Sequence, residues 1–175
     1  MKKLIALVLA LVLTLGTTAA LAAGYGLGVS TSISSSKDAT AEKNGTAQAD
    51  TTVCALVVDD EGKIVSCLFD VAQTKIAYSV DGKITADKTA ELKTKHELGD
   101  AYNMRPASPI GKEWNEQATA LAEYCIGKTL AEVLANVTSD ETGHCNAEDL
   151  KTSVTMSVGA FLTALEKAYT QATAK

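Results

Sequence analysis

The sequence predicts an α+β fold: an antiparallel β-meander of three to four strands packed with about three helices in a single domain. Two observations lead to this prediction. β-rich runs separated by glycine-containing turns come first, and stretches with helical periodicity follow them. Strands grouped before helices are typical of α+β domains, and the roughly 150 residues behind the N-terminal leader suffice for one hydrophobic core.

The N-terminus has the features of a Sec signal peptide. Two lysines precede an apolar run over residues 4–15, and Ala20 and Ala22 then form an A-x-A cleavage pattern. A transmembrane helix needs about 20 apolar residues, and this run is shorter. We therefore predict that residues 1–22 are removed as a signal peptide and that the chain is secreted or extracytoplasmic, with no membrane span after cleavage.

The charge balance argues against nucleic acid as a partner. The chain has 16 basic and 21 acidic residues, a net charge of −5. Signal cleavage removes two lysines and no acid, which leaves 14 basic against 21 acidic residues and a net charge of −7. Binding to nucleic acid depends on a basic face that neutralises phosphates, so we expect no nucleic-acid partner.

Residues 23–50 are predicted to be a flexible tether. They consist mainly of Gly, Ser, Thr, Ala, Asn and Lys and contain few large apolar side chains. Such a segment cannot bury enough apolar surface to offset the entropy lost on ordering. We therefore expect order to begin near Thr51 and one α+β domain to occupy residues 51–175.

The first half of that domain predicts the meander. Residues 52–58 and 63–69 are β-rich and flank the turn sequence Asp-Asp-Glu-Gly, which indicates a hairpin. Residues 75–80 predict a third strand, and an Asp-Gly turn then leads into a short fourth strand around Ile84.

The second half predicts three helices behind a long loop over residues 88–111. Apolar residues recur at helical spacing over residues 114–125, with Gly127 as a stop. The sequence Thr-Leu-Ala-Glu at 129–132 is a capping box that starts a second helix. A last amphipathic helix is predicted over residues 158–172.

Four cysteines in an exported chain raise the question of disulfides. If the first hairpin turns about residues 60 and 61, Cys54 lies directly opposite Cys67, and the two can bond where the strands approach most closely. The alternative is that both are small, buried apolar side chains. A second bridge between Cys125 and Cys145 follows only by elimination.

The sequence has no recognised enzyme or metal signature. His144 and Cys145 lack further ligands at recurrent spacing, so we expect no metal site. No nucleophile elbow, phosphate-binding loop or dinucleotide fingerprint occurs. His96, Ser108 and the acids near them lack a recognised catalytic spacing. We expect an electron-transfer or binding domain in preference to an enzyme.

One segment immediately before the last predicted helix resembles a known motif. It reads Asp149-Leu-Lys-Thr-Ser-Val-Thr155 and is similar to the flavin-attachment motif of the FMN-binding domain family, which reads Asp, two variable residues, Ser or Thr, Gly, Ala, Thr. Asp149, Thr152 and Thr155 match, whereas Ser153 replaces the glycine and Val154 the alanine. The secretion signal, the hairpin sequence and the following helix are also similar, and residues 94–117 resemble exported clostridial-type proteins.

The resemblance implies an extracytoplasmic electron carrier. FMN would be esterified to Thr155 by a flavin transferase and would exchange electrons with membrane redox partners. The same resemblance places Asp149, Thr152 and Ser153 at the flavin site. Tyr102 and Arg105 lie on the long loop, where we expect them to cover the flavin ring and clamp a phosphate. A Ser/Thr cluster just before a helix also suits a phosphate physically.

Each of these assignments has an alternative. Thr155 or Ser157 can simply cap the following helix. Arg105 can form a surface ion pair with the many acids nearby, and Trp114 fits the buried core better than a flavin-stacking platform. The whole chain can also be a secreted binding or interaction module that is a degenerate member of the same superfamily and carries no flavin.

Overall fold

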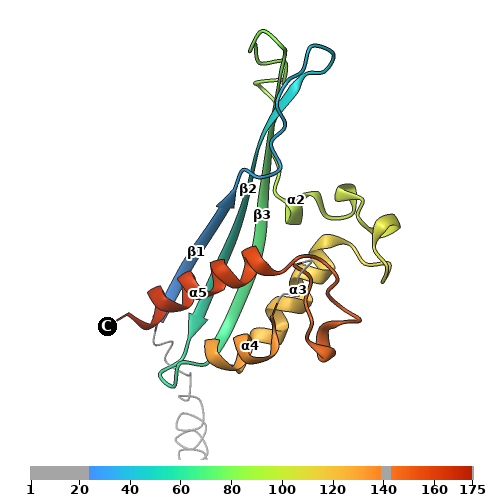
Figure 1. The fold of residues 1–175 in the computed structure, drawn as a ribbon. Helices are drawn as coiled ribbons and strands as arrows, with labels where there is room; N and C mark the ends of the chain where they lie inside the picture. The colour runs from blue at the N-terminus through green and yellow to red at the C-terminus, as the bar shows by residue number, and fades with distance from the viewer. Residues whose placement is uncertain (1–23, 139–142, 175) are drawn as a thin grey trace, which may run out of the picture.

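A computed structural model describes residues 24–138 and 143–174. It contains a three-stranded antiparallel sheet in the order β1-β2-β3, with helices packed against one face (Figure 1). The strands are β1 (Gly24–Ser32), β2 (Gly45–Val58) and β3 (Ile64–Tyr78). The helices are α2 (Lys95–Leu98), α3 (Trp114–Cys125), α4 (Leu130–Asn136) and α5 (Gly159–Thr173), with 3-10 turns η1 (Gly99–Tyr102), η2 (Arg105–Ala107) and η3 (Glu148–Leu150). The predicted α+β fold class is confirmed.

Two predictions concern the N-terminus and membranes. The predicted signal peptide, residues 1–22, lies outside the described residues. Within the described ranges, no helix is both long and apolar enough to cross a membrane.

Alternating burial along β2 explains which face of the sheet the helices cover. Thr52, Cys54, Leu56 and Val58 are all buried, whereas the residues between them are only partly buried. This two-residue period directs one set of side chains into the core beneath α3 and α5. Phe69 of β3 continues this face, and its ring meets Phe161 of α5 edge-on at 5.4 Å.

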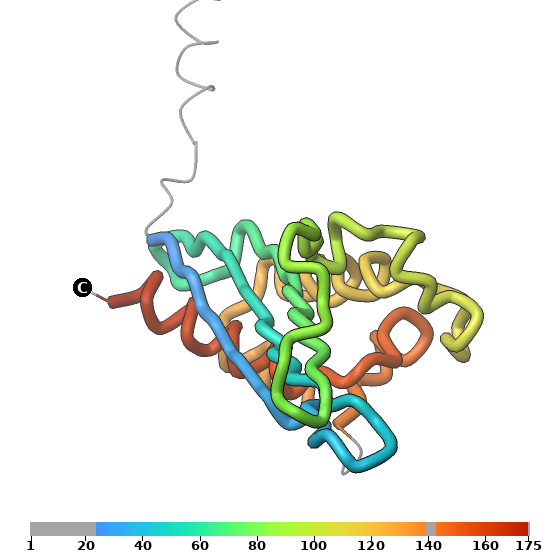
Figure 2. The backbone as a smooth tube through the Cα atoms, turned by 90° about the horizontal axis from the view of Figure 1, so that it is seen from above, coloured from blue at the N-terminus to red at the C-terminus, as the bar shows by residue number. Residues whose placement is uncertain are grey.

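The prediction of a tether is wrong for residues 24–50. Gly24–Ser32 forms strand β1, and β2 already begins at Gly45. Three alternating glycines of β1 lie directly on three alanines of α5. A Cβ atom added at Gly24, Gly26 or Gly28 would lie 1.8–1.9 Å from the carbonyl oxygen of Ala172, Ala168 or Ala164, respectively. Figure 2 shows α5 following the line of β1.

The match between β1 and α5 comes from two similar repeats. Two residues of a strand rise about 6.7 Å, and four residues of a helix rise about 6.0 Å. Glycines two apart therefore stay in step with alanines four apart, and the two backbones can approach closely along their length. The composition of this segment did not predict an ordered strand, because β1 packs on α5 through glycines, which have no side chain. Large apolar side chains, which the prediction looked for, are not needed for this contact.

Side chains of α5 also cover part of the free edge of β1. The Leu27 N–H donates to Oε1 of Gln171 at 2.6 Å, and Nζ of Lys167 donates to the Val29 carbonyl at 2.7 Å. These bonds occupy backbone groups that an unpaired edge strand would otherwise offer to another chain. The sheet face opposite the helices exposes Tyr25, Leu27 and Leu68, and no described helix covers it.

The register of the β2–β3 hairpin differs from the prediction. Cys54 pairs with Phe69 and Leu56 pairs with Cys67. The turn centres on Glu61, so that Val58 pairs with Ile64, and a β-bulge between Val57 and Val58 shifts the register by one further residue. The predicted third strand, residues 75–80, is mostly the far end of β3 and pairs with the first half of β2. Ile84 forms only an isolated bridge with Tyr78.

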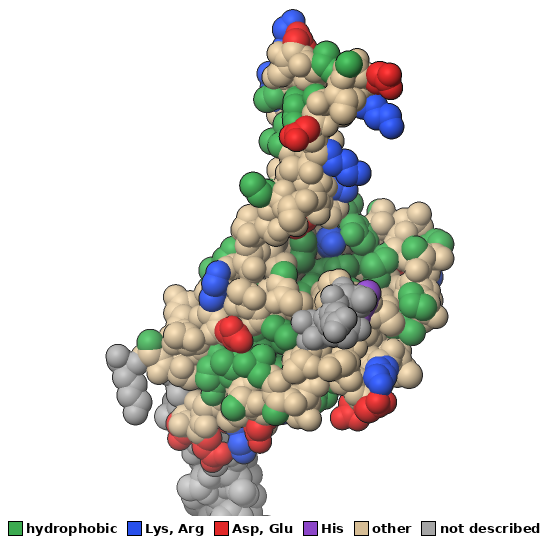
Figure 3. Space-filling view, in the orientation of Figure 1, with side chains coloured by type: hydrophobic (Ala, Val, Ile, Leu, Met, Phe, Trp, Pro, Cys, Tyr) green, Lys and Arg blue, Asp and Glu red, His purple; other side chains and the backbone are tan. Residues whose placement is uncertain are grey.

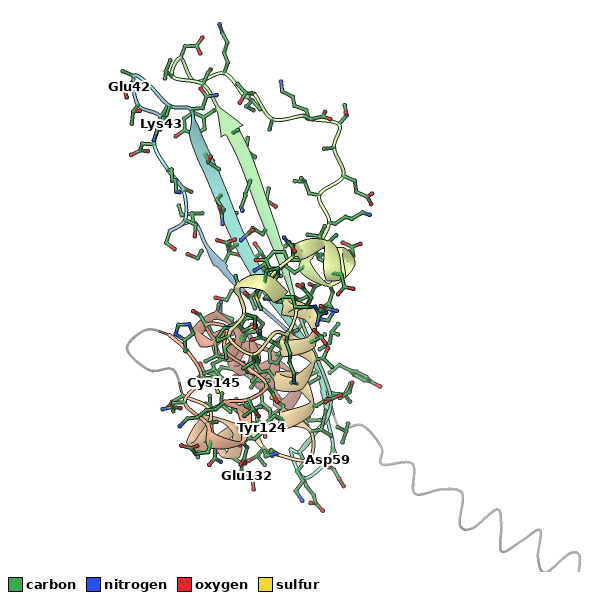
Figure 4. The ribbon with its side chains drawn as sticks, turned by 90° about the vertical axis from the view of Figure 1, so that its right-hand side faces the viewer. Glu42, Lys43, Asp59, Tyr124, Glu132 and Cys145 are labelled. Carbon is green, nitrogen blue, oxygen red and sulfur yellow. The ribbon has the colours of Figure 1, made fainter. Side chains whose placement is uncertain are left out.

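The far halves of β2 and β3 project beyond β1 and the helices as a two-stranded arm (Figure 1). Glu42 and Lys43 lie at its tip, far from Tyr124 in the helical layer (Figure 4). Figure 3 shows charged and hydrophobic side chains together at the tip. Val80 and Ile84, at the turn that follows β3, are exposed.

The predicted helices formed where their local signals were clear. Thr129 caps α4 in a capping box, with its hydroxyl accepting from the Glu132 N–H and the Glu132 carboxylate accepting from the Thr129 N–H. Trp114 is 3% exposed, which confirms it as a core residue. The predicted loop over residues 88–111 contains α2 and the two 3-10 turns η1 and η2.

Candidate functional site

A buried carboxylate anchors the start of α3. Glu113 is 2% exposed and is the N-cap of the helix, where it forms a capping box with Glu116. Its carboxylate also accepts from the Met104 N–H at 2.8 Å and the Arg105 N–H at 2.9 Å. One acidic side chain thus satisfies backbone donors of both the helix and the preceding loop.

Gln117, one turn further along α3, joins two loops that are distant in sequence. Its side chain is fully buried. Nε2 donates to the Ser108 hydroxyl at 3.2 Å and to the Lys112 carbonyl at 3.3 Å. Oε1 accepts from the N–H groups of Thr155 and Met156 at 2.8 and 3.2 Å. We call Glu113 and Gln117 the α3 hub.

Thr155 is half-buried and is held by this hub. Its hydroxyl lies 3.3 Å from Oε1 of Gln117, the atom that also accepts its N–H. Helix α5 begins only at Gly159, with Val158 as its N-cap and no side-chain cap. The alternative prediction that Thr155 or Ser157 caps the helix is therefore wrong. The expected phosphate cradle is also altered, because the N–H of Thr155 is committed to Gln117.

Arg105 is surrounded by acids. Its guanidinium lies 3.2 Å from Asp100, 3.1 Å from Glu116 and 3.9 Å from Glu113, and it also donates to the Gly111 carbonyl at 3.2 Å. The alternative prediction of an ion pair with nearby acids is confirmed. A guanidinium paired with three carboxylates is poorly suited to clamp an added phosphate, since those acids would repel it.

Tyr102 lies against the edge of the aromatic core. Nζ of Lys95 is 4.7 Å from the centre of the Tyr102 ring and 5.3 Å from the Trp114 ring, within the range of cation–π attraction. The His96 ring meets Trp114 edge-on at 5.4 Å. This places His96 in a packing role beside α3.

The upstream motif residues lie in different surroundings from Thr155. Asp149 is exposed and lines a polar cavity of about 410 Å³ together with Tyr124. Burial, and after it the Asp149 carboxylate, raise the pKa of Tyr124. Thr152 is exposed, and Ser153 follows the 3-10 turn η3, with its N–H bonded to the Leu150 carbonyl at 2.8 Å. The motif is thus divided between this cavity and the α3 hub.

Three of the four cysteines gather between the sheet and α3, and all four are free thiols. The Sγ atoms of Cys54 and Cys67 are 4.0 Å apart. The Cys125 thiol donates to the Leu121 carbonyl at 3.3 Å and lies close enough to Cys67 to shift its pKa. The prediction that Cys54 lies directly opposite Cys67 is wrong, because the position of the turn and the bulge together make them diagonal neighbours. Cys125 contacts Cys67, whereas the prediction by elimination paired it with Cys145.

The thiols sit in surroundings that disfavour charge. The nearby Cys125 thiol lowers the pKa of Cys67, but the contact with Cys54 and burial outweigh it and raise that pKa far above its usual range. The contact with Cys67 and burial raise the pKa of Cys125, and burial raises that of Cys145. Among the described residues, no group of three or more His, Cys, Asp or Glu side chains is arranged to hold a metal ion.

The prediction overlooked Glu113 and Gln117, although the sequence carries a weak signal for them. They flank Trp114 and Ala118 on the buried side of α3, so two polar side chains fall within or beside an apolar stripe. A buried polar side chain must find partners, and here those partners are loop backbones.

One known protein shows clear similarity. The chain is 36% identical over 108 residues to a protein described as chlorophenol reductase from Desulfitobacterium hafniense. The alignment covers 55% of this chain and 33% of that relative, so the chain corresponds to about a third of the relative's length. No protein-family model matches the chain. No solved structure matches it.

Proposed function

We propose that this chain is an exported redox protein that carries FMN through Thr155 and passes electrons between membrane reductants and external acceptors. The observation that carries the redox part is the 36% identity with a protein described as a reductase. The flavin part rests on the similarity of residues 149–155 to a flavin-attachment motif and on the position of the Thr155 hydroxyl.

The attachment end of the motif fits a phosphoester. Thr155 is half-buried, so part of the residue remains exposed, and its hydroxyl would have to leave Oε1 of Gln117 to form the ester. Gln117 is fully buried and holds the Thr155 backbone through its N–H, which fixes the acceptor residue in place. Asp149 and Thr152 are exposed, and a flavin transferase would approach the motif from this side. When bound, the flavin would supply the redox chemistry, while the protein would position it.

The other end of the predicted site fits less well. Arg105 is already paired with Asp100, Glu113 and Glu116, and we leave it out of the proposed phosphate contacts. Tyr102 keeps its proposed place beside the flavin ring, because it lies at the edge of the aromatic core next to Lys95.

The test is co-expression with a flavin transferase, followed by intact mass and visible absorbance. We expect a yellow protein whose mass increases by FMN less one water, because the Thr155 oxygen forms the ester. Thr155→Ala should lose both signals. Ser157→Ala is the matched control, since it removes a hydroxyl two residues away and should keep the flavin. A colourless, unmodified product beside an active transferase and a flavinylated control substrate would refute covalent attachment.

A second candidate function is a secreted binding module without flavin. It is favoured by the internal bonds of the predicted ligand groups, since both Arg105 and Thr155 are already engaged within the chain. In this case, titration with FMN should leave the flavin fluorescence unchanged while the apo protein unfolds cooperatively. Quenching of flavin fluorescence by the wild-type protein would exclude this candidate.

A further inference from the structure

A cluster of three thiols lies where β2, β3 and α3 meet, and the flavin proposal does not use it. Cys54 and Cys125 are fully buried, whereas Cys67 is only partly buried. Cys67 lies close to both of the others: its Sγ is 4.0 Å from that of Cys54, and it is near enough to the Cys125 thiol for each to shift the pKa of the other. Cys67 is therefore the shared member of two thiol pairs.

Cys67 is also the member that solvent molecules can reach. It lines a surface cavity of about 250 Å³ between β3, α2 and α3. The walls are partly apolar, with Phe69 and Ile126, and partly polar, with His96 and Glu123. Cys54 and Cys125 do not line this cavity, so a reagent entering it meets Cys67 first.

The two pairs differ in how well they suit a disulfide. Cys54 and Cys67 are diagonal neighbours on adjacent strands. Diagonal Cα atoms are typically about 7–8 Å apart, whereas a disulfide needs about 4.4–6.8 Å. A bond within the sheet would therefore require a shift of the backbone against the ladder.

Cys125 is placed differently, because the end of α3 is tied to the start of β3. The Gly127 N–H donates to the Ile64 carbonyl at 2.8 Å, and the Ile64 N–H donates to the Lys128 carbonyl at 2.9 Å. These bonds hold the last residue of α3 beside the strand that carries Cys67. The Cys125 thiol donates to the Leu121 carbonyl at 3.3 Å, so a bond to Cys67 requires this one side chain to turn and leaves the strand ladder in place.

We propose that Cys67 and Cys125 are a redox-active dithiol, which small disulfide oxidants reach through the cavity at Cys67. The Cys67 thiol loses its proton and its sulfur attacks the external disulfide, which releases one thiol and leaves a mixed disulfide. The Cys125 sulfur then attacks Cys67, forms the Cys67–Cys125 bond and releases the second thiol. The pair loses two electrons and two protons, and the oxidant gains them as two thiols.

The test uses the processed chain, purified in reduced form and incubated with oxidised glutathione at alkaline pH, because the raised pKa of Cys67 leaves little of the attacking thiolate near neutrality. We expect the intact mass to fall by two hydrogens. Peptide mapping without reduction should then show one cross-link, between the peptides that contain Cys67 and Cys125. This measurement needs no substitution, so it does not depend on how a variant folds. It also separates this proposal from flavin attachment, which changes the mass by a different amount.

Single substitutions identify which cysteines react. Cys67→Ser should abolish the two-hydrogen loss, and Cys125→Ala should trap one glutathione on Cys67. Cys145→Ser is the matched control and should behave as the wild type. A cross-link that contains Cys54 or Cys145, a stable glutathione adduct on the wild-type chain, or an unreacted Cys67 would each overturn the proposal.

Discussion

Replacing Gly26 by alanine tests the contact between β1 and α5 directly. The added Cβ would lie 1.8 Å from the Ala168 carbonyl oxygen and 2.6 Å from its carbonyl carbon. Both are backbone atoms, so no side-chain rotation relieves the clash. The contact must lengthen to at least 3.0 Å, which forces the strand and the helix apart along a face that includes Ala164 and Ala168.

The expected cost is about 3 kcal/mol or more, at or above the upper end for overpacked cores. This is a large part of the roughly 5–15 kcal/mol by which a domain is stable. In urea, with a slope of about 2 kcal/mol per molar, the unfolding midpoint should fall by about 1.5 M. Circular dichroism across a urea series measures this midpoint.

Gly159→Ala is the matched control. It makes the same chemical change at the first residue of α5, where an added Cβ meets nothing within 4 Å. Alanine there should alter the free energy of unfolding by no more than about 1 kcal/mol, toward greater stability. If Gly26→Ala unfolds at the wild-type midpoint, β1 does not pack on α5, and the description of residues 24–50 as a tether regains its standing.

Two further substitutions probe polar groups. Gln117→Leu should cost about 2–4 kcal/mol in urea unfolding, because it removes a fully buried acceptor from the N–H groups of the half-buried Thr155 and Met156. Hydrogen exchange at these two amides should speed up, and unchanged exchange would contradict the role of the α3 hub. Burial raises the pKa of Asp50, but hydrogen bonds from two glutamines outweigh it, so its pKa lies below 3.8 in the folded chain. The stability it contributes is present above pH 3.8 and is lost as the pH falls through the lowered folded pKa. Asp50→Asn should therefore flatten the acid limb of the stability curve, and an identical acid limb in both proteins would refute this.

A sequence motif specifies the order of its residues but not their positions in space, and this explains why the structure divides the candidate site. The motif at residues 149–155 is contiguous in sequence, yet Asp149 lines a polar cavity beside Tyr124 while Thr155 bonds to Gln117. Neighbours in sequence need not share a surface once a 3-10 turn intervenes. Arg105 was correctly expected on the loop, but only the fold brings Asp100, Glu113 and Glu116 around it.

The sequence by itself determined the features that depend on local chemistry. The capping box at Thr129, the apolar stripe of Trp114 and the turn of the first hairpin are each specified within a few residues, and the structure contains all three. The fold class follows from these signals, because strands that bury one face and helices that bury one stripe must pack together.

Only the tertiary structure decided the features that depend on distant partners. The glycines of β1 acquire a function solely because the alanines of α5, about 140 residues later, present a flat surface to them. The position of the turn and the bulge at Val57 and Val58 together moved Cys67 away from its expected partner, and the packing of α3 placed Cys125 near it. Close backbone approach and strand register depend on pairs of segments, and neither segment encodes them alone.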